Sequence, residues 1–386
     1  MIEIRDKSMC CGCEACKNIC PKKCIIMKKD EEGFEYPEVD ETKCINCGAC
    51  NRVCQYEHEV NELQKDKEPE VYSCTINDKK ELKNSTTAAV FFNLASYVIE
   101  NEGVVYGVKY DSKMKVVHTR TENLEELNEL RGSKYIQSKI GQVYTLIKKD
   151  LNNNKIVLFS GTPCQVGGLY KFLGKNYKNL ITVDIICFGV PSPGIYMDYL
   201  DEQEKKYKSK IKNIDFRDKA NGWNNSYTRI KFENENINYY KPSNENEWYA
   251  TFTSHICTRK ACNNCLYTSL YRKSDITIGD FWGIEKIDSK IDSRYGVEKV
   301  ILNTNKGTEL FNKISYKYNI QKRKLKEAIR PNLQHPPKEN KNREDFFVTY
   351  NKKGFNKAYT KFVKNTFSKK IKRKIGELKR KILKEE

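Results

Sequence analysis

The chain has 386 residues, 38% of them hydrophobic and 31% charged, with a formal net charge of +19 at pH 7 and 16 cysteines. This length allows two or three domains with a buried core. No stretch approaches the ~20 apolar residues of a membrane span, and the first residues lack the apolar region of a signal peptide. The positive charge favours an acidic partner, but no nucleic-acid-binding motif accompanies it, so we do not expect nucleic acid to be that partner.

Two copies of one cysteine pattern lie near the start of the chain. The first copy consists of Cys10, Cys13, Cys16 and Cys20. The second copy consists of Cys44, Cys47, Cys50 and Cys54. The tandem spacing C-x2-C-x2-C-x3-C is typical of the two [4Fe-4S] clusters of a bacterial-type ferredoxin, where the fourth cysteine of each run ligates the other cluster. The expected ligand sets are therefore Cys10, Cys13, Cys16 with Cys54, and Cys44, Cys47, Cys50 with Cys20.

Zinc and disulfides are the alternatives, and both fit this pattern poorly. Zinc sites commonly use two separated C-x2-C pairs or added histidines. Cys11 and Cys24 fall outside the pattern, and we interpret them as unligated packing residues. We predict a two-cluster ferredoxin domain over residues 1–58, with short strands at 24–27 and 33–37, followed by a charged linker over 59–70. Clustered cysteines of this kind favour a reducing cytoplasm.

From residue 71 the pattern changes to strands that alternate with helices. We expect strands at 71–75, 103–108, 115–119, 155–159 and 180–186, and helices at 87–100, 123–131, 141–151 and from 165. Strand–loop–helix units of this kind indicate an α/β domain. Antiparallel strands are then expected at 211–217, 227–233 and 236–240, and a further apolar segment at 275–282. The fold class is α+β multidomain, with the α/β core extending over 71–345.

A second group of cysteines lies in this core. Its members are Cys164, Cys187, Cys257, Cys262 and Cys265. Cys164 and Cys187 each follow a buried strand, and such strand ends share one edge of an open α/β sheet. The two can therefore converge with the pair Cys262 and Cys265 on a third [4Fe-4S] cluster. Zinc and inert buried cysteines remain the alternatives.

Residues 346–386 form a predicted basic helical tail. Its apolar positions step by three or four residues, which is typical of an amphipathic helix with lysines and arginines on the other face: Phe367, Ile371, Ile375, Leu378 and Ile382. Three interpretations stay open for this helix, namely peripheral contact with the inner face of a membrane, docking on a partner subunit, and a solvated tail.

Four motifs follow one another in the core: 131–138 (RGSKYIQS), 160–165 (SGTPCQ), 187–192 (CFGVPS) and 274–282 (SDITIGDFW). Together and in this order they resemble the coenzyme F420 hydrogenase/dehydrogenase beta-subunit family. The resemblance implies an FAD-binding α/β core beside a [4Fe-4S] cluster, although it does not separate FAD from FMN. The flavin contacts that it implies are Ser133, Lys134, Tyr135, Gln137, Gly161, Thr162 and Pro163. It also favours Cys187, Cys262 and Cys265 as ligands, with Cys164 or Cys257 as the fourth.

One departure from the family pattern concerns the turn at 84–89. Relatives often have glycines there, whereas this chain has Asn-Ser-Thr-Thr-Ala-Ala, whose side chains make a close cofactor approach harder. The favoured function is an oxidoreductase that passes electrons through the clusters to a flavin and on to an organic, anionic substrate or coenzyme F420. The alternative is a non-catalytic electron-transfer subunit. A redox partner protein or acidic electron carrier is expected in both cases, and no catalytic residue is assigned.

Overall fold

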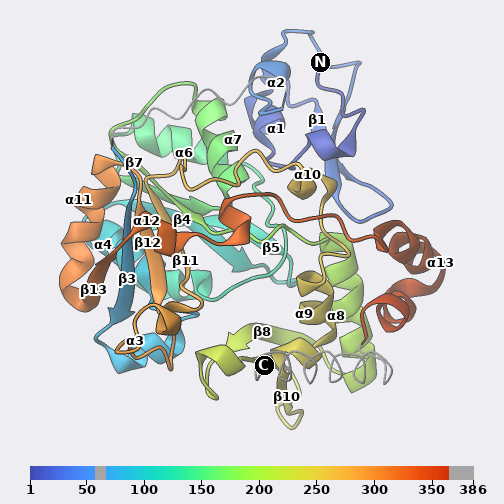
Figure 1. Cartoon of the computed structure of the whole chain (residues 1–386). Helices are drawn as coiled ribbons and strands as arrows, with labels where there is room; N and C mark the ends of the chain where they lie inside the picture. The colour runs from blue at the N-terminus through green and yellow to red at the C-terminus, as the bar shows by residue number, and fades with distance from the viewer. Residues whose placement is uncertain (57–66, 365–386) are drawn as a thin grey trace, which may run out of the picture.

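The computed structural model describes residues 1–56 and 67–364. Most of the predicted linker and the apolar positions predicted for the tail helix, Phe367 to Ile382, therefore lie outside the described residues. The described chain forms an N-terminal module, a large central sheet covered by helices, and a smaller sheet with its own helices (Figure 1).

The N-terminal module covers residues 1–56 and is built around a small hairpin. Strands β1 (Ile25–Lys29) and β2 (Glu35–Val39) pair antiparallel. Two short helices, α1 (Ala15–Ile19) and α2 (Ala49–Arg52), precede and follow this hairpin. Each helix starts from a left-handed residue, Glu14 or Gly48, which turns the chain sharply beside the cysteines.

The central sheet has eight strands in the order β13-β3-β12-β11-β7-β6-β4-β5. Their bounds are β3 Glu70–Ile76, β4 Val104–Tyr110, β5 Val116–Thr121, β6 Val157–Gly161, β7 Leu180–Ile185, β11 Ile276–Asp280, β12 Glu298–Leu302 and β13 Tyr318–Arg323. The four middle strands β11, β7, β6 and β4 are parallel, and the outer pairs are antiparallel. The carboxyl ends of the parallel strands therefore meet at one edge, where α/β sheets bind ligands.

Helices cover both faces of this sheet, because successive strand residues point to opposite sides. On one face, α4 (Val90–Glu100) and α11 (Asn305–Ile314) pack on buried residues such as Val105 and Leu158. On the other face, α6 (Val143–Asn152) and α7 (Pro163–Leu173) pack on the strand residues adjacent to these, such as Val104 and Phe159. The short helices α3 (Lys79–Asn84), α5 (Leu124–Leu127), α10 (Lys260–Asn263) and α12 (Leu325–Ala328) lie in the connections.

A second lobe forms around a three-stranded antiparallel sheet. Its strands are β8 Ile211–Asp218, β9 Tyr227–Phe232 and β10 Tyr239–Pro242, and its helices are α8 Pro193–Tyr207, α9 Glu247–Thr253 and α13 Arg343–Phe362. These elements share one hydrophobic core, which also takes in Phe34 and Tyr36 of the N-terminal module. Helix α13 lies beside α8 (Figure 1) and is interrupted at Gly354, whose φ is 77°. The predicted tail boundary at 346 thus falls inside a helix that packs on the second lobe.

The mixed α/β fold with a large mixed sheet confirms the predicted α/β character of the core. The expected strands from 71–75 to 180–186 all form, and so does the helix predicted at 87–100, which begins three residues later, at Val90. Helices α8 and α11 and strands β12 and β13 were not predicted from the sequence.

Candidate functional site: three cysteine-lined cavities

Two cavities in the N-terminal module are each lined by four cysteines of the tandem pattern. The first cavity is lined by Cys10, Cys13, Cys16 and Cys54. The second cavity is lined by Cys20, Cys44, Cys47 and Cys50. Each set takes its fourth cysteine from the other copy of the pattern, as the spacing predicts. Ligation of iron by these residues stays a prediction.

Backbone donors point at some of these sulfurs. The amide of Ile2 donates to Cys50 Sγ at 3.2 Å, and the amide of Asn46 donates to Cys44 Sγ at 3.4 Å. Hydrogen bonds of this kind stabilise cluster-bound thiolates and help to set their reduction potential. Both of these sulfurs line the second cavity, and in the first cavity Arg259 Nη2 donates to Cys10 Sγ at 3.7 Å. The residues present therefore fit a [4Fe-4S] cluster in each cavity.

A third cavity, the core cavity, lies at the carboxyl edge of the central sheet. Its cysteines are Cys164, Cys187, Cys262 and Cys265, together with Cys11 of the module. Cys164 is the second residue of α7 after β6, and Cys187 follows β7. Cys262 lies in α10. The parallel strands β6 and β7 thus bring two distant cysteines to the late pair.

Each of the four core sulfurs has a polar neighbour. The amides of Gly189, Val190 and Tyr267 donate to Cys187, Cys262 and Cys265 at 3.4, 3.5 and 3.4 Å, respectively. The Thr162 hydroxyl lies 3.2 Å from Cys164 Sγ. Burial raises the pKa of Cys262 to about 12, so that binding of iron there would displace a proton from the thiol.

Cys257 does not line the core cavity. It is fully buried in the hydrophobic core of the second lobe, where burial raises its pKa to about 12. Of the two contenders for the fourth core ligand, the structure therefore brings only Cys164 to the other three.

Within residues 1–56 and 67–364, no group of three His, Cys, Asp or Glu side chains is arranged to hold a metal ion. A cubane spreads its four cysteine ligands around a cluster instead of gathering them on one ion. Each of the three cavities is lined by four such cysteines, the number that a [4Fe-4S] cluster requires.

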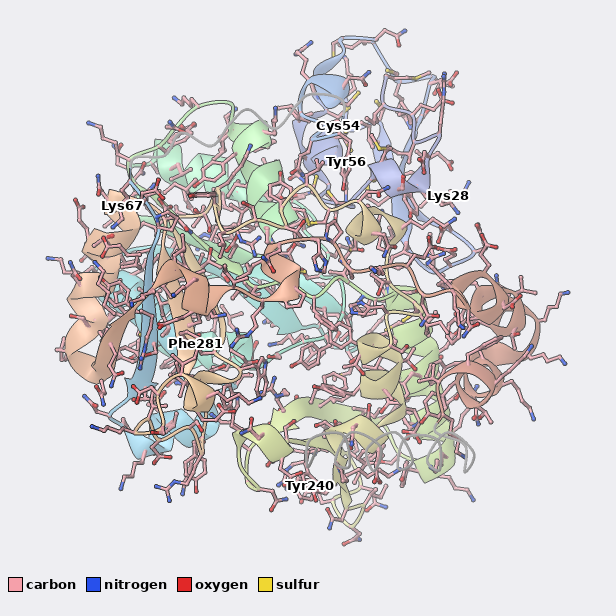
Figure 2. All side chains as sticks on the ribbon, viewed as in Figure 1. Lys28, Cys54, Tyr56, Lys67, Tyr240 and Phe281 are labelled. Atoms are coloured by element: carbon pink, nitrogen blue, oxygen red, sulfur yellow. The ribbon has the colours of Figure 1, made fainter. Side chains whose placement is uncertain are left out.

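The first cavity and the core cavity are neighbours, since Cys11 and Tyr56 line both of them. Gln55 connects the two walls: its Nε2 donates to Cys11 Sγ at 3.6 Å and to the Cys164 carbonyl at 2.9 Å. The Tyr267 hydroxyl donates to Gln55 Oε1. Figure 2 shows Cys54 and Tyr56 at the junction between the module and the core.

The buried side chain of Arg259 also joins the two regions. Its Nε donates to the Cys10 carbonyl at 2.7 Å, and its Nη1 donates to Gln137 Oε1 at 3.0 Å. Gln137 Nε2 in turn donates to the Cys11 carbonyl at 2.9 Å. An added Cβ at Gly12 would lie 2.7 Å from Gln137 Nε2, so the module loop and the core approach closely only because this residue is glycine.

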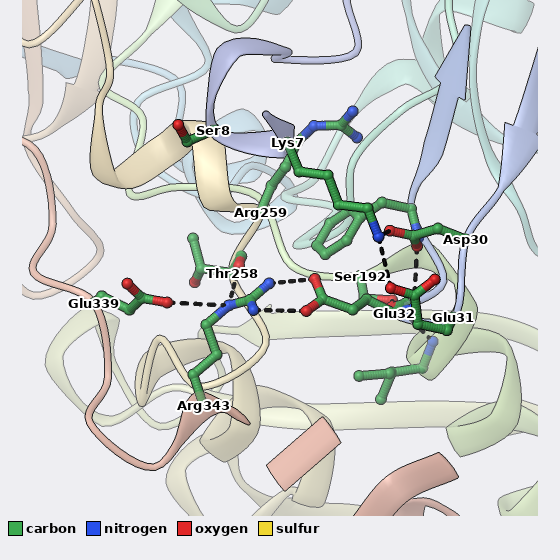
Figure 3. A network of polar contacts seen from close by, with 12 residues as sticks. Lys7, Ser8, Asp30, Glu31, Glu32, Ser192, Thr258, Arg259, Glu339 and Arg343 are labelled. Carbon is green, nitrogen blue, oxygen red and sulfur yellow. Dashed lines mark hydrogen bonds and ion pairs between the residues drawn. The ribbon is translucent and has the colours of Figure 1, made fainter. Parts of the chain in front are cut away.

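A second polar network holds the module against helix α13 (Figure 3). Arg343, buried at the start of α13, donates from Nη1 to Glu32 Oε1 at 2.7 Å and from Nη2 to Glu32 Oε2. Its Nε donates to the Thr258 carbonyl at 3.2 Å. Close by, the Ser192 hydroxyl donates to the Glu32 carbonyl at 2.6 Å.

Five of the seven residues implied as flavin contacts fall into two groups. Gly161, Thr162 and Pro163 lie at the end of β6, and Pro163 lines the core cavity. Ser133 and Tyr135 lie farther along the edge of the sheet: the Ser133 hydroxyl donates to Thr86 Oγ1 at 3.3 Å, and the Tyr135 ring stacks on Phe252 at 4.7 Å.

Two other implied flavin contacts are already engaged. The amide of Gln137 is shared between Cys11 and Arg259. Lys134 Nζ donates to the Arg131 carbonyl at 2.8 Å, and burial lowers the pKa of Lys134 to about 8.

The altered turn before α4 keeps a glycine-like backbone without a glycine. Ala89 takes φ 62° as the N-cap of α4. The amides of Ala88 and Val90 donate to Glu298 Oε2 at 3.0 and 3.2 Å. The start of α4, which suits an anion, is thus occupied by a carboxylate of the chain itself.

Residues 154–328 match the family described as the C-terminal part of the beta subunit of coenzyme F420 hydrogenase/dehydrogenase. Over this range the chain is similar to that family. A chain of the F420-reducing [NiFe] hydrogenase complex from Methanosarcina barkeri is 17% identical, with a TM-score of 0.42, covering 75% of this chain and 90% of that one. No curated protein matches the chain.

The matched range 154–328 includes the four cysteines Cys164, Cys187, Cys262 and Cys265 of the core cavity, and it also contains Arg217 and Asp280. Arg217 Nη1 donates to Asp280 Oδ2 at 3.0 Å and to the Tyr135 hydroxyl at 3.2 Å. Sequence reasoning missed Arg217, because a single arginine at the end of an ordinary strand gives no motif. No helix in the described part of the chain is long and apolar enough to cross a membrane.

Proposed function

We propose that this chain is an iron–sulfur flavoprotein oxidoreductase that carries electrons between a protein partner and an organic acceptor. The similarity of residues 154–328 to a family of hydrogenase and dehydrogenase beta subunits supports redox work. The observation that carries the proposal is the set of three cavities, two lined by four cysteines of the tandem pattern and one lined by Cys164, Cys187, Cys262 and Cys265. Because Cys11 and Tyr56 line two of them, cofactors held there would be close neighbours.

The residues that would hold the three clusters follow from these cavities. Two clusters belong to the module, which we take as a ferredoxin domain over residues 1–58. A third belongs to the core over 71–345, with Cys164, Cys187, Cys262 and Cys265 as its ligands. A [4Fe-4S] cluster supplies one-electron transfer at a potential set by charge and hydrogen bonds at its sulfurs. Arg259, which also lies 3.7 Å from Cys10 Sγ, supplies a buried positive charge near that sulfur.

A flavin in the core would supply two-electron chemistry, and FAD is the form that the family resemblance implies. Ser133, Tyr135 and the Gly161–Pro163 turn are the residues of this chain that would orient it beside the core cavity. The formal charge of +19 supports an acidic electron carrier and an anionic substrate, with coenzyme F420 as one candidate. The clustered cysteine patterns support work in a reducing cytoplasm.

A second candidate function is that of an electron-transfer subunit without a flavin. One observation favours it: the amides at the start of α4 are bonded to Glu298 and are not available to a cofactor phosphate.

Purification without oxygen, followed by analysis of iron and of flavin released by acid, tests both candidates. The flavoenzyme predicts about twelve irons, four for each of three clusters, and about one flavin per chain. Twelve irons without flavin, and no retention of added FAD, would favour the electron-transfer subunit. A content of about eight irons per chain would show that the core holds no cluster, because the two clusters of the module account for eight.

A further inference from the structure

Arg217 is a buried cation whose hydrogen bonds are half complete. Its side chain is 4% exposed. Nη1 uses its two hydrogens on Tyr135 and Asp280. Nε and Nη2 have no hydrogen-bond partner among the described residues. A buried guanidinium normally has its donors satisfied, so these two nitrogens require an explanation.

The two unpartnered nitrogens lie on the same edge of the guanidinium. The Nε–H and one Nη2–H bond run parallel there, and this fork matches the two oxygens of a carboxylate or phosphate. The carboxylate that pairs with Arg217, that of Asp280, is held away from the Nε–Nη2 edge. Its Oδ1 accepts from Thr87 Oγ1 at 2.9 Å and from Trp223 Nε1 at 3.0 Å, which leaves Oδ2 for Nη1.

The surroundings keep Arg217 charged and fixed. Burial opposes the charge, but the nearby Tyr135 and Asp280 raise the pKa of Arg217 above its ordinary value. The Trp282 ring lies 5.0 Å from the guanidinium carbon and stacks on Trp223 at 4.1 Å. Trp282 is 39% exposed, so the guanidinium is one side chain away from solvent.

The site stands at the ligand-binding edge of the sheet. Asp280 is the last residue of β11, whose carboxyl end lies beside those of β7 and β6. Tyr135, which is bonded to Arg217, is in ring contact with Phe252, and Phe252 contacts Phe188 next to Cys187. An aromatic series therefore connects Arg217 with the core cavity.

We propose that the Nε–Nη2 edge of Arg217 is a binding site for an oxyanion, a carboxylate or phosphate group of a molecule that docks at this edge of the sheet. The oxyanion belongs either to the bound cofactor or to the electron acceptor. The choice between these two sources rests on the proposed function, whereas the anion site itself stands on the geometry of Arg217.

The test uses the full chain purified without oxygen and measures the thermal midpoint against inorganic phosphate or acetate, with ionic strength held constant by chloride. In the wild-type chain, or in chain freed of flavin, one of the two anions should raise the midpoint saturably. Arg217→Lys keeps the charge but not the fork, and should weaken this binding by about tenfold or more. Arg229→Lys, on the neighbouring strand β9, should leave it unchanged, since Arg229 is 41% exposed and paired with Asp218.

Flavin content separates the two sources. Loss of flavin in Arg217→Lys with iron unchanged would assign the oxyanion to the cofactor. Retained flavin with weakened anion binding would assign it to the acceptor. If Arg217→Lys does not fold, Tyr135→Phe removes a group that orients Nη1 and should weaken anion binding severalfold. The proposal is overturned if neither anion binds saturably to the wild-type chain, with or without flavin. It is also overturned if the Arg217 and Tyr135 variants bind the anion as tightly, and hold as much flavin, as the wild-type chain does. Failure of the proposed function alone would instead appear as missing flavin with the anion site intact.

Discussion

The ion pair between Glu32 and Arg343 makes a sharp prediction about how the N-terminal module is held. The Arg343 side chain is 2% exposed and that of Glu32 is 11% exposed, and two parallel hydrogen bonds join them. Removal of one partner from a buried pair costs about 3–5 kcal/mol, because the other charge stays buried without compensation. Arg343→Met should therefore weaken the contact between the module and the second lobe by about this amount.

Amide hydrogen exchange measures this loss of stability at the contact itself. At about 1.4 kcal/mol per tenfold, the loss corresponds to roughly a hundredfold to several thousandfold faster exchange of amides at the contact, such as Gly194, which donates to the Gly33 carbonyl at 3.1 Å. The double variant Glu32→Met with Arg343→Met should recover most of the protection.

The matched control is Lys28→Met, which removes an exposed ion pair to Glu38 on the same module. It should change exchange by no more than about threefold, because exposed pairs contribute little. If Arg343→Met behaves like this control, or if the double variant is no better than the single one, the reasoning on the buried pair is wrong.

Three further predictions concern burial, close packing and the spare cysteine. Burial lowers the pKa of His118 to about 4, so the folded chain resists protonation and loses stability as the pH falls from about 6.5 towards 4. At pH 5.5 the loss is roughly 1–2 kcal/mol, and His118→Gln should remove this part of the pH dependence of urea unfolding. Gly194→Ala would place a methyl 2.6 Å from Gly33 Cα, and exchange at this contact should report a loss of about 1–3 kcal/mol. Cys11→Ala should leave the iron content unchanged, since each cavity keeps four other cysteines, and a loss of about four irons would make Cys11 a ligand.

Local pattern was enough to predict the parts of the fold that depend on short segments. The largely apolar segments at 155–159 and 180–186 indicated buried strands of a parallel sheet, and such strands end at one edge. That rule alone predicts that Cys164 and Cys187 lie close together. In the same way, the tandem cysteine spacing predicts which cysteines of the module lie close together.

Strand β12 shows why other parts were missed. Its first two residues, Glu298 and Lys299, are charged, which argues against a strand buried in the middle of a sheet. In the fold, Glu298 accepts the amides at the start of α4, and Lys299 Nζ donates to the Ala328 carbonyl at 2.8 Å. Both partners are far away in the sequence, so no local pattern predicts them.

Contacts at the candidate site were also missed because the partners are far apart in the sequence. The motif that contains Gln137 suggested a cofactor contact, but its amide is bonded to Cys11 and Arg259, more than a hundred residues away on either side. Arg217 became visible only once the sheet placed it beside Tyr135 and Asp280.

The central claim is that the core holds a third cluster on Cys164, Cys187, Cys262 and Cys265, next to the two of the module. The most direct measurement compares iron per chain in Cys164→Ser and Cys257→Ser, both purified without oxygen. We predict about eight irons for Cys164→Ser and about twelve for Cys257→Ser, because only Cys164 lines the core cavity. Twelve irons in Cys164→Ser, or eight in Cys257→Ser, would contradict the account.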